Sequence, residues 1–240
     1  MSKKEELLAE LGSLTPTGTR QRLAFGSANK LGSAQDVQKT PLARAIKNHH
    51  NWLKTLPAEE ASKMNVSVHV NDIMRGSAGK LGGHLLDNSK ESYSMLIPVD
   101  KYFSKAGKEQ MDHFKHPSGA SSYLLGHTII GNVTMDKIKA GQEFESADGE
   151  TVYHFELPTR KAPEFGLKKD FIRVNAVDKN SGMKIMNAHA LHFSTADGST
   201  AITVSRALIP TAEIVEQNEQ MMKKKEMDAE NFGMTDEDEY

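Results

Sequence analysis

The sequence contains no cysteine among its 240 residues. Disulfides, thiolate zinc sites and cysteine nucleophiles are therefore excluded, and the composition fits a reducing compartment. Apolar runs such as those around Leu124 and Ile129 fall far short of the ~20 residues that a membrane-spanning helix needs. The first residues form no apolar stretch, so we expect no secretory signal. We therefore expect a cytoplasmic protein without a membrane partner.

Charge is unevenly distributed along the chain, although the net charge is only −2. Residues 1–130 contain 17 Lys/Arg and 12 Asp/Glu, whereas residues 131–240 contain 13 and 20. The stretch from Glu226 to Tyr240 has seven acidic residues and no basic one. The basic excess of residues 1–130 is too small to indicate nucleic-acid binding by itself.

Residues 1–39 are predicted to be a short helix followed by an extended arm. Ser2 and Glu5 have capping-box spacing, which favours a helix that ends near Gly12. The residues that follow show neither helical nor strand periodicity and carry isolated apolar anchors at Leu23 and Phe25. The pattern is typical of an arm that reaches outside its own domain.

Residues 40–210 are predicted to form the main α+β domain. Thr40 followed by Pro41 is a favoured helix start, and Pro57 ends the helical spacing. The alternating valines of residues 66–70 predict a strand, residues 76–83 a glycine-rich loop, and residues 93–99 another strand.

From about residue 121 the pattern becomes β-rich. Five strands are predicted, over residues 122–133, 151–157, 170–177, 183–194 and 200–209. Turn sequences between the last three predict an antiparallel meander. The expected fold is α+β, with an antiparallel barrel or sandwich in the C-terminal half and a helical and irregular N-terminal part. Residues 211–240 are predicted to be a polar helix and an acidic tail.

No motif reaches the specificity of a catalytic or metal signature. The loop Gly76–Gly83 lacks P-loop spacing, because Leu81 follows Lys80 where Ser or Thr would be needed. A surface loop or interface contact is therefore preferred to a phosphate site. We interpret the histidine pairs 49/50, 113/116 and 189/192 as surface or half-buried residues, since none supplies three or four zinc ligands. We expect no catalytic residue, metal or cofactor, and an enzyme ranks third among the hypotheses.

The C-terminal residues Met234-Thr235-Asp236-Glu237-Asp238-Glu239-Tyr240 resemble the acidic tails of phage and bacterial single-stranded-DNA-binding proteins. The resemblance implies a tail that recruits partners and competes with DNA. An OB-like barrel would then present stacking and basic side chains. The candidates are Tyr153, Phe155, Phe171, Phe193, Lys168, Lys169 and Arg173. Alternatively, Tyr153, Phe155 and Leu157 form one buried face of an alternating strand, which we prefer because aromatic residues are only 6% of the chain.

The leading hypothesis is a non-enzymatic structural protein of a large assembly, such as a minor capsid, connector or neck protein of a tailed-phage virion. It rests on architecture: a β-rich body with an arm and a terminal helix that clasp neighbouring subunits. The expected partners are copies of itself or other subunits, with single-stranded DNA as the alternative. The predicted interface residues are Arg20, Arg22, Leu23, Phe25, Ile214, Met221 and Met222.

Overall fold

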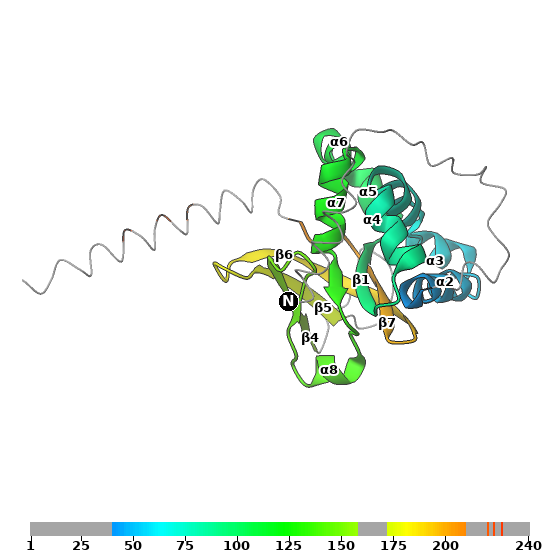
Figure 1. Ribbon diagram of the computed structural model, residues 1–240. Helices are drawn as coiled ribbons and strands as arrows, with labels where there is room; N and C mark the ends of the chain where they lie inside the picture. The colour runs from blue at the N-terminus through cyan, green and yellow to red at the C-terminus, as the bar shows by residue number, and fades with distance from the viewer. Residues whose placement is uncertain (1–39, 158–171, 210–219, 221–222, 224–226, 228–240) are drawn as a thin grey trace, which may run out of the picture.

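A computed structural model describes residues 40–157 and 172–209, together with Gln220, Lys223 and Met227. Figure 1 shows a curved sheet with most of the helices gathered on one side of it. The fold class predicted from the sequence is confirmed, since the protein is α+β with a mostly antiparallel, nearly closed barrel-like sheet.

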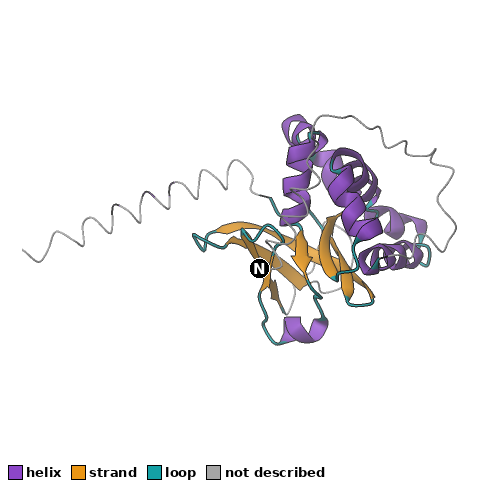
Figure 2. Ribbon diagram, in the orientation of Figure 1, coloured by secondary structure: helices purple, strands orange, loops and turns teal. Residues whose placement is uncertain are grey.

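The helices come mainly from the first half of the described chain. They are α2 (Pro41–Leu53), α3 (Ala58–Lys63), the π-helix η2 (Val68–Ser77), α4 (Gly79–Gly83), the π-helix η3 (His84–Asn88), α5 (Asp100–Lys105), α6 (Lys108–Lys115), α7 (Pro117–Gly126) and α8 (Met135–Lys139). Figure 2 shows that α8 lies apart from the other helices, near the opposite end of the sheet.

Seven strands form one sheet in the order β2-β1-β7-β6-β5-β4-β3. Their bounds are β1 (Tyr93–Pro98), β2 (Thr128–Ile130), β3 (Phe144–Glu145), β4 (Thr151–Glu156), β5 (Ile172–Asp178), β6 (Lys184–Ala196) and β7 (Ser199–Val204). All neighbours are antiparallel except β1 and β7, which pair in parallel from Ser94↔Thr200 to Pro98↔Val204. The predicted meander is confirmed as β5, β6 and β7, with β4 paired antiparallel to β5.

The two edges of the sheet meet, which gives it the barrel-like curvature. An isolated antiparallel bridge links Ile129 in the middle of β2 to Ser146 directly after β3. The Ala147 N–H also donates to the Thr128 carbonyl at 2.6 Å. Closure of this kind removes exposed edge strands.

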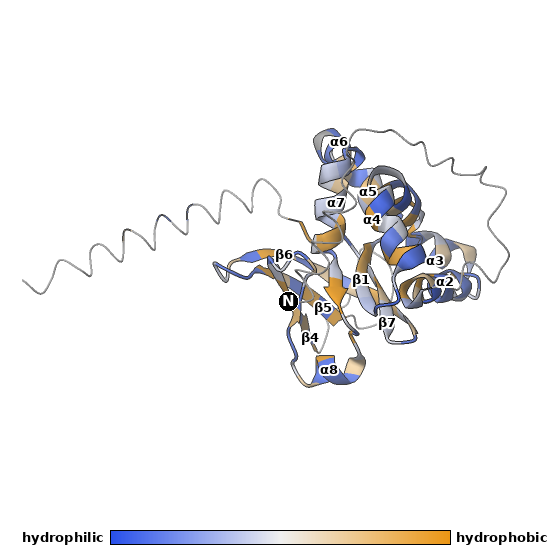
Figure 3. Cartoon of the chain, viewed as in Figure 1, coloured by the Kyte–Doolittle hydropathy of each residue, from blue (hydrophilic) through white to orange (hydrophobic). Residues whose placement is uncertain are grey.

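Two hydrophobic cores lie on opposite faces of the sheet. On β1, Tyr93, Met95 and Ile97 pack against the helices, whereas Leu96 belongs to the barrel core with Ile202 of β7. Successive side chains of a strand alternate between the two faces, so both faces of β1 are buried and all six residues are apolar or small. Figure 3 shows β1 as a hydrophobic strand among helices with largely hydrophilic outer surfaces.

The predicted start of the first long helix is confirmed in atomic detail. The Thr40 hydroxyl accepts a hydrogen bond from the Ala43 N–H at 3.2 Å, and Pro41 occupies the first helical turn. The same hydroxyl donates to the Leu86 carbonyl at 2.7 Å. One side chain therefore both caps α2 and joins it to η3.

Three local predictions were wrong. The predicted strand over residues 66–70 is the start of η2, because Val66, Val70 and Ile73 are buried at helical spacing. The predicted loop at residues 76–83 is largely α4, in which Leu81 and Gly82 are buried. The predicted strand over residues 122–133 is the end of α7 followed by only the three residues of β2.

The N-terminal helix and arm, and most of the C-terminal helix and tail, lie outside the described residues. Gln220, Lys223 and Met227 are helical and exposed. No helix in the described part of the chain has the length and apolar character to cross a bilayer.

Candidate functional site

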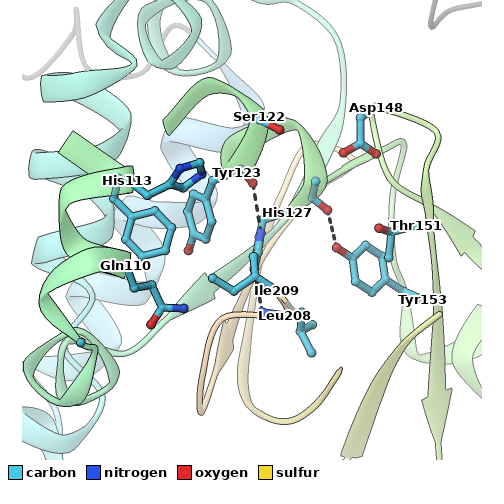
Figure 4. A pocket seen from close by; sticks show the side chains of 13 residues that line it. Gln110, His113, Ser122, Tyr123, His127, Asp148, Thr151, Tyr153, Leu208 and Ile209 are labelled. Atoms are coloured by element: carbon cyan, nitrogen blue, oxygen red, sulfur yellow. Dashed lines mark hydrogen bonds between the residues drawn. The ribbon is translucent and has the colours of Figure 1, made fainter. Parts of the chain in front are cut away.

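A cavity of about 690 Å³ lies between α6, α7 and the start of β4. Figure 4 shows its side chains converging from these elements and from the segment after β7. The lining residues are Gly107, Gln110, His113, Phe114, Ser122, Tyr123, Gly126, His127, Asp148, Thr151, Tyr153, Leu208 and Ile209. His113 and Ser122 are exposed, whereas Tyr123, His127 and Tyr153 are buried. The volume is typical of a pocket for a small ligand or a few side chains.

His127 is fixed in the cavity wall by hydrogen bonds at both ring nitrogens. Its Nε2 accepts from the Leu208 N–H at 2.9 Å, so the proton is on Nδ1, which donates to the Tyr123 carbonyl at 3.0 Å. Burial lowers the pKa of His127 to about 4, although the bond to Tyr123 opposes this shift. The ring is therefore neutral near pH 7 and joins α7 to the segment after β7.

Two buried tyrosines complete the floor of the cavity. The Tyr153 hydroxyl donates to the Gly126 carbonyl at the end of α7. Burial raises the pKa of Tyr153, and the negative charge of Asp148 raises it further. Burial also raises the pKa of Tyr123, whose hydroxyl lies 3.0 Å from His69 Nδ1. Both phenols are thus protonated and already hydrogen-bonded within the protein.

His69 lies behind Tyr123 and is fully buried. Its Nε2 has no hydrogen-bond partner among the described residues. Burial lowers the pKa of His69 to about 3, with a smaller contribution from His127 in the same direction. The free-energy cost of burying an unpaired ring nitrogen here is smaller when the imidazole is neutral.

The structure describes four of the residues predicted for nucleic-acid stacking. Tyr153 and Phe155 belong to the barrel core, as the preferred interpretation of their strand predicted, but Leu157, which was expected on the same buried face, is 44% exposed. Phe193 is half-buried against the same core, and its ring centroid lies 6.4 Å from that of Phe155. Arg173 pairs with Glu156 at 3.5 Å across β4 and β5. These four side chains do not form one exposed platform.

The other predicted site residues lie outside the described residues. These are Phe171, Lys168 and Lys169 of the nucleic-acid set, and Arg20, Arg22, Leu23, Phe25, Ile214, Met221 and Met222 of the interface set. The structure places none of them.

The three histidine pairs occupy different surroundings. The interpretation as surface or half-buried residues is wrong for His49, which is buried and bonds the Met64 carbonyl at 3.1 Å through Nε2 in the packing of α2 on the sheet. His192 stacks on Trp52 with ring centroids 3.6 Å apart. His113 and His116 are exposed. No set of three or more His, Asp or Glu side chains in residues 40–157 and 172–209 is arranged to hold a metal ion.

Comparison with known proteins identifies no family for this chain. No protein-family description matches the sequence, and no curated protein matches it either. Among solved structures, it is similar to a FAS1 domain pair from the insect cell adhesion molecule fasciclin I, with a TM-score of 0.38 and 10% sequence identity. The match covers 68% of this chain and 45% of that chain. At this level of similarity it supports no inference about function.

The sequence did not reveal the cavity. Its walls come from α6, α7, the turn before β4 and the residues after β7, which are widely separated along the chain. Residues 122–133 were expected to form a strand, so α7, which carries Tyr123 into the cavity wall, was not predicted. The spacing of Ala120, Tyr123, Leu124 and His127, all buried, was the available helical signal.

Proposed function

We propose that the protein is a non-enzymatic structural component of a large assembly, and that the cavity between α6 and α7 receives a segment of a neighbouring subunit. The observation that carries the proposal is the composition of this cavity. Aromatic and aliphatic side chains form its floor, and polar side chains such as Gln110, Ser122 and Asp148 lie among them. A partly apolar cavity with a few polar groups suits the capture of side chains.

The state of the buried ionisable groups supports binding rather than proton transfer. A general base needs a free lone pair and a pKa near the working pH. His127 has both nitrogens in hydrogen bonds and a pKa of about 4. Tyr153 donates to a backbone carbonyl and has a raised pKa. These groups stabilise the wall of the cavity.

The specific form of the proposal is a virion component of a tailed phage, such as a minor capsid, connector or neck protein. Such a protein would be made in the cytoplasm and assembled there. Its partners are copies of itself or other subunits of the particle. Both described hydrophobic cores are formed by residues 42–208, which suits a body that engages neighbours through its terminal segments.

Light scattering on the full chain and on a variant lacking residues 1–39 tests the proposal. We expect the full chain to form a defined oligomer and the truncated chain to be a folded monomer. Circular dichroism and thermal unfolding establish that the truncated body is folded. A full chain that is monomeric at all concentrations, or an oligomer unchanged by the deletion, would overturn the proposal.

The same measurement with a short single-stranded oligonucleotide tests the alternative. Burial of Tyr153 and Phe155 leaves the described part of the predicted stacking surface without exposed rings. For the assembly protein we expect no change of mass on adding the oligonucleotide. A mass shift that reverses at high salt would instead support single-stranded DNA binding.

A further inference from the structure

Asp148 gives the cavity between α6 and α7 an acidic character. Among the described residues that line it there is no lysine or arginine, and Asp148 is the acidic one. His127 and the two tyrosines are neutral near pH 7. A ligand that enters this cavity therefore meets the carboxylate of Asp148 beside apolar walls, which favours a cationic group.

The carboxylate of Asp148 is held in place by its own turn. Its Oδ1 accepts from the Ser146 hydroxyl at 2.5 Å and from the Glu150 N–H at 3.0 Å. Its Oδ2 lies against α7, 3.3 Å from the point where a Cβ on Gly126 would be. Figure 4 shows Asp148 and Ser122 on the same side of the cavity. A preorganised carboxylate of this kind suits a guanidinium group, which binds carboxylates through two parallel hydrogen bonds.

Apolar side chains form the rest of the cavity. Phe114 and Tyr123 contact each other with ring centroids 4.8 Å apart, and Leu208 and Ile209 also line the cavity. This surface would accommodate aliphatic or aromatic side chains next to the cationic group. The fitting partner is a segment in which arginine stands close to leucine or phenylalanine.

The N-terminal arm of this chain carries such a segment. Residues 11–35 contain three basic residues, Arg20, Arg22 and Lys30, and no acidic residue. Leu23 directly follows Arg22, and Phe25 comes two residues later. Phe25 lies 15 positions before Thr40, where α2 is capped, and such a length of chain can span at most about 50 Å. The arm is long enough to reach a neighbouring copy.

We propose that residues 20–25 of one copy dock into the cavity between α6 and α7 of a second copy, with an arginine of the segment against Asp148. This inference rests on the proposed function and names the partner segment for its site. The apolar side chains Leu23 and Phe25 occupy the aromatic and aliphatic part of the cavity.

Cross-linking of the full chain tests the position of the segment. A photoreactive benzoyl-phenylalanine replaces Phe25, and chains labelled with ¹⁵N are mixed with unlabelled chains before irradiation. We expect cross-links between labelled and unlabelled chains, on residues 107–127, 148–153 or 208–209. Cross-links confined to a single chain, cross-links that map elsewhere, or no cross-link in a sample that is oligomeric would overturn the inference.

Charge substitutions test the contact with Asp148. Asp148→Asn keeps the acceptor of the turn and removes the charge, so it should raise the dissociation constant of the oligomer about tenfold, as expected for one lost charge-assisted contact. The matched control is Asp72→Asn, on an exposed residue of η2, which should leave the dissociation constant unchanged. Equal constants for wild type and Asp148→Asn would exclude the contact.

A charge exchange is the second part of this test. Replacing both Arg20 and Arg22 by Glu should weaken assembly, and adding Asp148→Lys to that variant should restore it in part. Deletion of residues 226–240 should leave assembly unchanged. Loss of assembly on that deletion would instead indicate that the arm binds the acidic tail. If arm deletion abolishes the oligomer but cross-links avoid the cavity, the assembly function stands and only this site is wrong.

Discussion

The two hydrophobic cores of the protein differ in what they bury. The core between the helices and the sheet includes His69 and Tyr123, and His49 and His127 lie at its borders. The barrel core contains one buried tyrosine, Tyr153, and the N–H of its Leu208 donates to the ring of His127. Buried histidines must remain neutral to be tolerated. The helical side of the sheet is therefore the acid-sensitive one.

The helical side is also the more tightly constrained in its backbone. Two π-helical segments, η2 and η3, flank the short helix α4. A Cβ on Gly82 would lie 1.6 Å from the Met74 carbonyl oxygen, whereas a Cβ on Gly83 would have no neighbour within 4 Å. Adjacent glycines of one helix thus differ completely in the space around them.

The largest effect is expected from Gly82→Ala. The added methyl group overlaps the backbone of η2, which cannot move aside as a flexible side chain would, so α4 and η2 must separate. We expect a loss of more than about 3 kcal/mol in the free energy of unfolding, above the usual cost of overpacking. Urea denaturation followed by circular dichroism measures this loss.

Gly83→Ala is the matched control for this prediction. It adds the same methyl group one residue later in α4 with nothing in its way. Because alanine is favoured over glycine in helices, we expect a gain of about 0.5 kcal/mol or no change. Similar losses for the two variants would contradict the close contact between Gly82 and Met74.

Acid is expected to produce an effect that grows with each pH unit. The pKa values of His49, His69 and His127 in the folded protein are about 4, 3 and 4, below the ordinary 6.5. Between pH 6.5 and about 4 the unfolded chain binds more protons at these positions than the folded one. Stability is therefore complete above pH 6.5 and falls as pH decreases, by up to about 1.4 kcal/mol per pH unit for each histidine.

Unfolding free energies measured from pH 7.5 to 4.5 check this dependence. His69→Gln should reduce the slope by the contribution of one histidine, whereas His116→Gln, on an exposed residue, should leave the slope unchanged. A wild-type slope near zero over this range would show that these histidines are not buried as neutral groups.

The smallest effect is expected from removing a helix cap, and one cap from each side of the sheet can be compared. Thr40 caps α2 and also bonds Leu86, and it is buried. Thr134 caps α8 beside the barrel with one bond, to the Lys137 N–H at 3.3 Å. Thr40→Ala should cost about 2 kcal/mol and Thr134→Ala about 0.5 kcal/mol, the upper and lower ends of the range for lost caps. Thermal unfolding distinguishes the two, and equal shifts would indicate that the bond to Leu86 contributes nothing.

Sequence patterns predicted the elements whose signals are local. The cap at Thr40 and the turns around Gly182 and Gly198 depend on neighbouring residues, and both glycines have positive φ, at 67° and 85°. β5 alternates between buried and half-buried residues because one of its faces fills the barrel, whereas β7 is buried on both faces. For these reasons the start of α2 and the order of the last three strands were predictable.

The remaining elements depend on contacts between distant residues. Val66 and Val70 fit both an alternating strand and one face of a helix, and packing of η2 against α4 and α7 selects the helix. Pro117 follows the end of α6 at Lys115 and also begins α7, which was not predicted. The cavity needs all these elements in place, so its residues could not be predicted from their order in the sequence.

The parallel pairing of β1 with β7 has a consequence for the order of events during synthesis. The Tyr93 N–H bonds the Ser199 hydroxyl, a partner 106 residues later in the chain. At the usual pace of translation, about 5–20 residues per second, β1 waits for many seconds before β7 emerges. Until then the apolar strand has β2 on one side and no neighbour on the other, which is the condition under which nascent chains recruit chaperones. The last strand of the body to be synthesised completes the centre of its sheet.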